Sequence, residues 1–175
     1  FIIDEINRGN LSKIFGELFM LIEKDKRGIE LQLLYSDENF SVPANVYIIG
    51  MMNTADRSLA MLDYALRRRF SFFTMKPGFN TPGFQAYQDS LKNDAFNKLI
   101  ACVKQLNSQI VEDISLGEGF CIGHSYFCGL TPETANTQTL SSIVEYELIP
   151  LLKEYWFDEP AKIVDWSDRL RSAVK

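Results

Sequence analysis

Three short runs of apolar residues, with little polar interruption, stand out in the first part of the chain. They cover residues 1–3, 46–52 and 70–75. Runs of this kind are typical of strands covered on both faces, because a strand with one solvated face alternates apolar and polar residues. The pattern therefore predicts buried strands of a largely parallel sheet.

Helical spacing separates these runs. Apolar residues recur every three or four positions over 11–22 and again over 59–70. Asn10 is the expected N-cap of the first helix, and Gly28 lies just beyond its expected end. The stretch 29–43 instead predicts a hairpin of two short strands around a polar turn. Strands and helices that follow one another in this way indicate an α/β core.

The rest of the chain carries helical patterns and no further strong strand signal. The apolar residues of 96–110 define one face of an amphipathic helix. A second helix is expected over 140–155 with a kink at Pro150, and a third is expected from Pro160 with Asp158 as its cap. This half of the chain is predicted to be all helical.

Length and composition agree with two folded parts. The chain has 175 residues, 46% of them hydrophobic, which is enough for one sizeable core and a smaller second one. We expect an α/β domain over 1–78 and an all-helical domain over 79–175. No repeat or low-complexity tract interrupts either.

Charge, hydropathy and cysteine usage narrow the class of protein. A formal net charge of -5 provides no overall positive field to attract nucleic acid. No run approaches the roughly 18 apolar residues of a membrane helix, so we predict a cytoplasmic protein without membrane contact. Cys102, Cys121 and Cys128 are odd in number and sparse, which favours free thiols in a reducing compartment.

Polar residues follow directly on two of the predicted strands. Asp4 and Glu5 come after the first run, and Asn53 comes after the second. A carboxylate pair at a strand end suits metal-assisted phosphoryl transfer, where one carboxylate holds Mg²⁺ and the other polarises a water. Asp4 and Glu5 are also explained if they only cap the next helix and complement its dipole.

Asn53 favours the interpretation of Asp4 and Glu5 as catalytic residues. On an adjacent parallel strand its amide would lie beside Asp4 and Glu5, able to orient a water or a phosphate. The residues from Asn53 to Ser58, which include Asp56, also suit an ordinary turn and helix cap. Both interpretations are compatible with each other.

Two further groups of residues allow a functional and a structural interpretation. Arg67, Arg68 and Arg69 precede a predicted buried strand, where they would suit phosphate or carboxylate partners, or simply a solvated helix end. Cys121, His124 and Cys128 resemble zinc-ligand spacing, but no fourth ligand lies nearby in the sequence. We expect core cysteines and a histidine that supports its surroundings.

Three segments in this order carry a family resemblance. "FIIDEIN", "YIIGMMNTADRS" and "LDYALRRRF" resemble the Walker B, sensor 1 and arginine-finger segments of AAA+ NTPases. With "GFCIGHSYFCGL" and "LIPLLKEYWFDEP", the string "MNTADRS" closely resembles the McrB family, the GTP-dependent motor subunit of modification-dependent restriction systems. The resemblance implies a partial AAA+ P-loop NTPase core with an incomplete parallel sheet, followed by an all-helical lid.

The resemblance also implies roles for residues near the strand ends. Asp4 matches the residue that coordinates Mg²⁺ through water, Glu5 the residue that activates the attacking water, and Asn53 the sensor 1 residue. Arg68 and Arg69 match the arginines offered to a neighbouring subunit.

Other polar positions of the same elements match residues near the nucleotide. Asp56 and Arg57 are implied to bind nucleotide, and Arg57 and Asp63 match positions that bridge subunits. In the lid, His124 lies in the element closest to the nucleotide. Cys121 stands where a basic residue is expected, so the resemblance assigns no sensor 2 residue.

Nucleotide and partners follow from the resemblance alone. It implies Mg²⁺ with GTP, or ATP as the alternative, a homo-oligomeric ring, an McrC-like nuclease subunit, and DNA bound through regions outside this chain. The chain contains no G-x-x-x-x-G-K-[ST] string, which the resemblance places upstream of Phe1. We therefore expect a carboxyl-terminal portion with two unpaired strand edges that binds GTP poorly, hydrolyses none and is aggregation-prone or marginally folded.

Two other functions remain open from the residues. A MoxR-like or dynein-related AAA+ ATPase that remodels proteins would show the same Asp-Glu strand and sensor asparagine. A non-catalytic interaction module would use the strand-end residues as caps and the helical part as a binding platform. "MNTADRS" and "GHSYF" favour the McrB-like interpretation.

Overall fold

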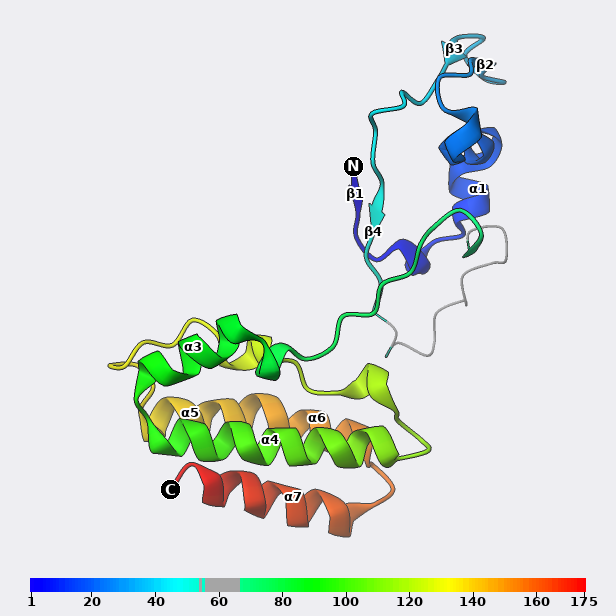
Figure 1. The fold of residues 1–175 in the computed structure, drawn as a ribbon. Coiled ribbons are helices and arrows are strands. Elements are labelled where there is room, and N and C mark those ends of the chain that lie inside the picture. Colours follow the sequence, from blue (N-terminus) through cyan, green and yellow to red (C-terminus); the bar gives the residue numbers. More distant parts are fainter. Residues whose placement is uncertain (54, 56–66) are drawn as a thin grey trace. The chain divides into compact units, whose positions relative to one another are not determined.

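A computed structural model describes residues 1–53, 55 and 67–175, and the chain in it divides into two compact units. The first unit covers Phe1–Thr74 and the second Met75–Lys175. Figure 1 shows strands in the first unit and helices in the second. The domain boundary that the sequence predicts at residue 78 stays a prediction. None of the described helices is long and apolar enough to cross a membrane.

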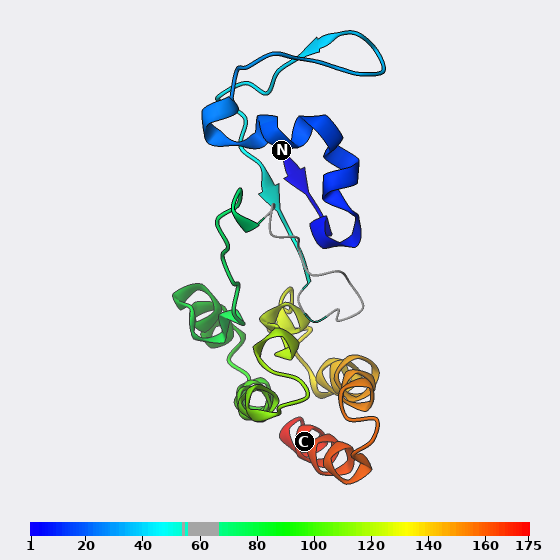
Figure 2. The ribbon, with the colours of Figure 1, turned by 90° about the vertical axis from the view of Figure 1, so that its right-hand side faces the viewer.

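A parallel pair of short strands forms the centre of the first unit. β1 (Ile2–Ile3) pairs with β4 (Ile49–Gly50), with Ile2 opposite Ile49. Figure 2 shows the two arrows side by side. The amide of Ile49 donates to the carbonyl of Phe1 at 2.9 Å, so the pairing extends beyond the two residues of each strand. The parallel strands predicted over 1–3 and 46–52 are confirmed.

The chain between the paired strands follows the predicted order of helix and hairpin. Asn10 caps α1 (Leu11–Phe15) by accepting a hydrogen bond from the amide of Lys13 at 3.0 Å. The predicted helix then tightens into a 3₁₀ stretch, Gly16–Ile22, because the turn after α1 has a glycine in a positive-φ conformation at Gly16. The predicted hairpin is present as antiparallel β2 (Leu31–Gln32) and β3 (Asn39–Phe40).

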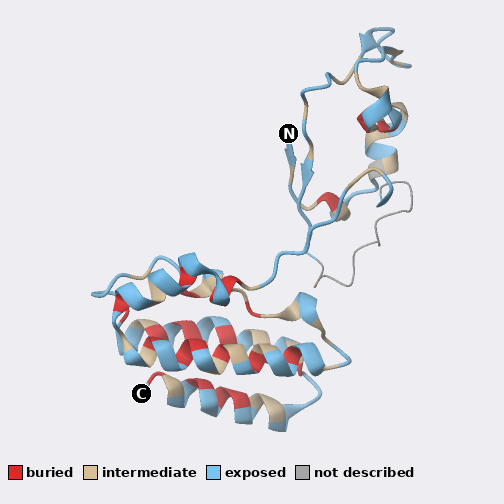
Figure 3. Ribbon diagram, viewed as in Figure 1, coloured by how far each residue is buried: buried red, intermediate tan, exposed pale blue. Residues whose placement is uncertain are grey.

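The first unit buries few of its apolar residues. Ile6, Phe19 and Ile22 form its buried cluster, whereas Ile2 is 65% exposed and Ile49 is 57% exposed. Figure 3 shows this unit mostly in the colour of exposed residues. The expectation of strands buried on both faces is wrong for β1 and β4. Among the described residues no third strand joins this pair, and the cluster of Ile6, Phe19 and Ile22 packs only against Ile3 and Ile48 there.

The third predicted strand is also wrong. Residues 70–75 form no strand, and both Phe72 and Phe73 are exposed, 52% and 88% respectively. An isolated apolar run gains little from an extended conformation unless another strand accepts its backbone hydrogen bonds. The helix predicted over 59–70 lies almost entirely outside the described residues.

The second unit, all of which is described, contains helices and no strand, as predicted. α4 and α7 lie side by side in Figure 1, and α6 packs against α7. Single 3₁₀ turns cover Gly78–Asn80, Glu118–Phe120 and His124–Phe127. The α-helices are α3 (Pro82–Leu91), α4 (Asp94–Glu112), α5 (Thr137–Ile143), α6 (Ile149–Tyr155) and α7 (Pro160–Ala173).

α4 is the helix around which the second core is built. Asn93 begins it by accepting from the amide of Phe96 at 2.9 Å, and the same side chain donates its amide to the carbonyl of Ala135. The apolar stripe predicted for this helix faces the core, as Figure 3 shows in red. Its buried members are Phe96, Leu99, Ile100, Val103, Leu106 and Ile110.

The helix predicted over 140–155 is present but interrupted. α5 passes into a π-helical turn, Val144–Leu148, which leads into α6. Pro150 lies in the first turn of α6, where its missing amide hydrogen removes one helical hydrogen bond. A π-helical turn before the proline is one way in which a helix accommodates that loss, so the irregularity expected at Pro150 is found just ahead of it.

Two helix starts differ from the sequence predictions. α3 is not predicted, although Thr81 caps it and Pro82 occupies its first turn. α7 begins as predicted at Pro160, but its N-cap position is Glu159 and not Asp158, and no side chain caps it. Proline in the first turn supplies the helical φ angle without an amide that would need a cap.

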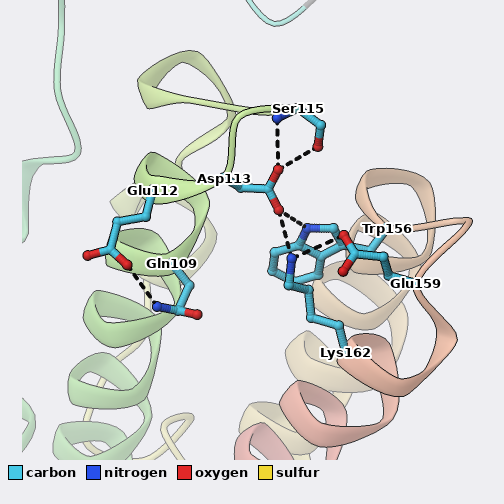
Figure 4. Close-up of polar contacts among 7 residues, drawn as sticks. All are labelled: Gln109, Glu112, Asp113, Ser115, Trp156, Glu159 and Lys162. Carbon is cyan, nitrogen blue, oxygen red and sulfur yellow. Dashed lines mark hydrogen bonds and ion pairs between the residues drawn. The ribbon is translucent and has the colours of Figure 1, made fainter.

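A buried carboxylate joins the end of α4 to α7 (Figure 4). One oxygen of Asp113 accepts from Lys162 Nζ and Trp156 Nε1, both at 2.8 Å, and the other accepts from the amide and hydroxyl of Ser115. The Asp113 side chain is 9% exposed. The hydrogen bond from Lys162, with those from Ser115 and Trp156, holds the pKa of the Asp113 carboxyl well below its ordinary value.

We predict that Asp113→Asn destabilises the helical unit at neutral pH by about 2 to 4 kcal/mol, because Lys162 then loses its buried partner. A carboxyl with a lowered folded-state pKa stabilises above its unfolded pKa, and this contribution disappears as pH falls through the folded-state pKa. The variant should therefore lose stability less steeply than the wild type below about pH 4.

Urea unfolding followed by tryptophan fluorescence measures this, since both tryptophans, Trp156 and Trp166, belong to the helical unit. Glu112→Gln is the matched control, because its carboxylate is exposed and bonds only to Gln109 in Figure 4. Equal unfolding midpoints for Asp113→Asn and Glu112→Gln at pH 7 would contradict the prediction.

Candidate functional site

The parallel pairing of β1 with β4 brings two polar strand ends to the same edge of the sheet. Asp4 and Glu5 follow β1, and Asn53 follows β4. The amide of Ile6 donates to the carbonyl of Met51 at 2.9 Å, so the two chains stay side by side past the strands. The arrangement expected from the sequence, carboxylates and an amide at one edge, is therefore the arrangement of the backbone.

The backbone turns sharply between the two carboxylates and the next helix. Glu5 has φ 53° and ψ 42°, a left-handed conformation that residues other than glycine rarely adopt. Its amide donates to Asp4 Oδ1 at 2.9 Å, and its own carboxylate accepts from Arg8 Nε at 2.9 Å. Uncommon backbone conformations of this kind are found at functional sites, where they direct a side chain.

Asp4 suits a magnesium ligand that acts through water. Its side chain is exposed, and one of its carboxylate oxygens accepts the Glu5 amide. Within the described residues, no group of three or more histidine, cysteine or acidic side chains could hold a metal. Mg²⁺ usually keeps several waters and takes one or two protein carboxylates together with phosphate oxygens, so a single exposed carboxylate fits this ion.

Asn53 takes part in a local turn. Its side-chain oxygen accepts from the amide of Ala55 at 3.0 Å, which is the hydrogen bond of an Asx turn. The turn chemistry considered for this residue is thus present. The turn uses the side-chain oxygen, and the NH₂ group of an asparagine is a donor.

Arg68 and Arg69 have different environments. Arg69 stacks over the ring of Phe19 at 4.2 Å and forms an ion pair with Glu23, and its side chain is only 8% exposed. Arg68 lies 3.9 Å from the same carboxylate and is 65% exposed. Arg67 is exposed as well. Arg69 therefore holds its own unit together, while Arg68 is exposed to solvent. The contact with a neighbouring subunit that the resemblance implies for both arginines stays a prediction.

Three further residues between Asn53 and Arg67 were also expected to act at the site. Asp56, Arg57 and Asp63 lie outside the described residues. Their expected contacts with nucleotide or with a second subunit stay predictions.

His124 contacts its own unit. Its Nδ1 accepts from the amide of Gly78 at 3.0 Å, and its ring meets those of Phe79 and Phe84 edge to face. The supporting role expected for this histidine agrees with these contacts. The nucleotide contact implied by the resemblance stays a prediction.

The two cysteines that flank His124 in the sequence also contact neighbouring backbone. Cys121 Sγ lies 3.9 Å from the carbonyl oxygen of Asn107, and Cys128 Sγ lies 3.3 Å from that of His124. Burial, together with the charge of Glu118, raises the pKa of the Cys121 thiol, which disfavours the thiolate that zinc would require.

Sequence reasoning missed two residues that shape this region. Arg8 lies three positions after Glu5, a spacing at which opposite charges on a helical turn meet, so the sequence contained a signal for that pair. Glu23 lies far along the chain from Arg69 and looks like an ordinary charged residue at a helix end. Nothing in the sequence marks it as the arginine's partner.

Comparison with known families divides the chain in a similar way. Residues 1–70 match the family described as AAA domain (dynein-related subfamily). Residues 98–164 match the family described as McrB, alpha-helical lid domain.

Two relatives belong to restriction systems. The chain is 53% identical over 180 residues to the Type IV methyl-directed restriction enzyme EcoKMcrB subunit of Escherichia coli K12, an alignment that covers 97% of this chain and 39% of the relative. It is 29% identical over 140 residues to the Type II restriction enzyme BsuMI component YdiS of Bacillus subtilis 168, covering 68% of this chain and 41% of the relative. The chain thus spans about two fifths of the length of each.

The match to an AAA domain covers the strand ends that carry Asp4, Glu5 and Asn53, and the match to the McrB lid covers most of the helical unit. With the high identity over nearly the whole chain, these matches show that the chain belongs to the McrB family of AAA-domain proteins.

Proposed function

We propose that this chain is part of a nucleoside-triphosphate-hydrolysing motor, the GTP-dependent, DNA-translocating subunit of a restriction system specific for modified cytosine. The observation that carries the proposal is the parallel pairing of β1 with β4, which delivers Asp4, Glu5 and Asn53 to one sheet edge. Membership of the McrB family and the restriction-system relatives support the assignment to a restriction system. The choice of GTP follows from the family resemblance alone. Cytoplasmic location is part of the same proposal.

Each residue of the edge has a role that its environment permits. Asp4 holds Mg²⁺ through water, since its exposed carboxylate suits an ion that retains its hydration. Glu5 polarises the attacking water, with Arg8 fixing its carboxylate, and Asn53 orients water or phosphate through its NH₂ group. When bound, Mg²⁺ supplies charge neutralisation on the phosphates.

The remaining assignments complete the proposal. Arg68 acts on the nucleotide of a neighbouring subunit in a homo-oligomeric ring, and Asp56, Arg57 and His124 lie near the nucleotide. An McrC-like nuclease subunit is the partner, and DNA binds through regions outside this chain. By itself the chain binds GTP poorly and hydrolyses none.

Hydrolysis of GTP and ATP by the full-length protein, with and without its nuclease subunit, tests the proposal. GTP turnover that rises with the partner and collapses in Asn53→Ala is the expected result. ATP turnover that does not respond to the partner would instead favour a protein-remodelling ATPase, to which the dynein-related match of residues 1–70 gives some support. Absence of any turnover in the full-length protein would favour a non-catalytic interaction module.

We predict that Glu5→Gln in the full-length protein lowers hydrolysis by roughly 10²- to 10⁴-fold and preserves nucleotide binding, because the amide keeps an oxygen for Arg8 but loses its basicity. Single-turnover hydrolysis and equilibrium binding of a fluorescent nucleotide measure the two effects. Asp25→Asn is the control, since Asp25 is exposed and forms an ion pair with its neighbour Lys26 in the described part of the chain. Unchanged hydrolysis in Glu5→Gln would remove Glu5 from the mechanism.

We predict that mutations of Arg68 and Arg69 have different effects. Arg68→Ala should lower hydrolysis in the assembled ring on the order of 10³-fold, the scale of a lost arginine finger, and should leave the fold intact. Arg69→Ala should expose the amides of 16–23 to faster hydrogen exchange, because Glu23 and Phe19 lose their partner.

Steady-state turnover and hydrogen exchange mass spectrometry, applied to both variants, check this separation. A small defect in turnover for Arg68→Ala, together with unchanged exchange in Arg69→Ala, would contradict it. Glu23→Gln offers a third variant, which should repeat the exchange result of Arg69→Ala because it removes the same ion pair.

A further inference from the structure

The first residues of the helical unit are tied to a segment more than forty positions later in the chain. Lys76 Nζ lies 3.1 Å from Glu118 Oε1, and the amide of Gly78 donates to His124 Nδ1 at 3.0 Å. Both contacts join 75–79 to Glu118–Phe127. The ion pair is exposed on both sides and is worth little by itself. The hydrogen bond to His124 is partly buried and is the stronger constraint.

The His124 ring is held in place by aromatic packing. Its centroid lies 6.3 Å from that of Phe79 and 5.8 Å from that of Phe84, with interplanar angles of 76° and 88°. Phe79 and Phe84 are buried and meet each other edge to face at 5.3 Å. Edge-to-face contacts of this kind orient rings as well as burying them. The acceptor nitrogen is therefore directed at Gly78 by the core of the unit.

Gly78 lies so close to the ring that a side chain would not fit without movement. A Cβ built at this position would lie 3.0 Å from His124 Cε1 and 3.1 Å from Nε2. Gly78 is buried, and its carbonyl accepts from both the amide and the hydroxyl of Thr81. The chain thus approaches α3 through Gly78, whose amide and carbonyl both form hydrogen bonds.

The hydrogen bond also determines how the imidazole can act. A ring nitrogen that accepts an N–H must carry a lone pair, so the proton of the neutral ring is on Nε2. His124 can then meet a ligand only as a donor through Nε2, which suits a phosphate or carbonyl oxygen. Metal coordination at Nε2 would require the opposite tautomer and the loss of the Gly78 bond.

We propose that His124 is a positioning residue for the start of the helical unit. Its Nδ1 fixes the backbone at Gly78, where the chain enters the helical unit, and its aromatic contacts connect that point to Phe79 and Phe84 in the core. Displacement of the segment Glu118–Phe127 therefore moves the start of the helical unit with it. This inference does not depend on the identity of the nucleotide.

Two variants of the full chain separate the hydrogen bond from the packing. His124→Phe keeps an aromatic ring between Phe79 and Phe84 and removes the acceptor, whereas His124→Asn places an amide oxygen where Nδ1 lies and removes the ring. We expect the Gly78 amide to exchange on the order of tenfold faster in His124→Phe, the scale of one lost hydrogen bond, and close to the wild-type rate in His124→Asn. Amide exchange measured by NMR reads this directly.

A glycine pair supplies the matched control, and the wild-type ring supplies a second readout. Gly78→Ala should disturb the His124 resonances, whereas Gly83→Ala should not, because a Cβ at Gly83 meets nothing within 4 Å. The ¹⁵N shifts of the wild-type imidazole should show a proton on Nε2 at neutral pH. A proton on Nδ1, or equal Gly78 exchange in His124→Phe and His124→Asn, would overturn the proposal whether or not the protein hydrolyses GTP.

Discussion

The parallel pairing of β1 with β4 is the constraint on which the site depends. Residues 47 positions apart in sequence pair in register, and the strand ends bring two carboxylates and an amide to one edge. Local structure then orients these groups: Glu5 through its left-handed backbone and Arg8, and Asn53 through its Asx turn. The sheet supplies the proximity, and short-range hydrogen bonds supply the orientation that the proposed phosphoryl transfer would require.

Arg68 and Arg69 are adjacent in sequence but differ in burial and in their contacts. Arg69 contacts Glu23 and Phe19, which lie in the segment after α1, and so it ties the last part of the first unit to that segment. With its neighbour anchored, Arg68 is presented at the surface from a fixed base. A guanidinium that must reach another molecule gains from such an anchor, because less conformational entropy is lost when it binds.

Local and periodic features were predictable from the sequence, and features that depend on distant partners were not. The six buried residues of α4, the Asn10 cap and the hairpin follow from spacing and residue type. α3 could also have been predicted, because Thr81 followed by Pro82 is typical of a helix start. The prediction of a strand over 70–75 was wrong because a strand requires a hydrogen-bonding partner, and a local pattern does not show whether one is present. Asp113 meets Trp156 and Lys162 across 43 and 49 positions, so nothing near it in the sequence marks a partly buried ion pair.

The two units differ in how many of their apolar side chains are buried among the described residues. The helical unit has a large buried core that includes Trp156 and Phe127, and the side chains of Asp113 and Asn93 form hydrogen bonds at its edge. The α/β unit leaves Ile2 and Ile49 more than half exposed beside the residues proposed for catalysis. Since local stability follows buried apolar contacts, the strand ends proposed for catalysis are the less protected part. Among the described residues, β1 and β4 pair only with each other, so a strand or partner added beside them would act directly on the geometry of Asp4, Glu5 and Asn53.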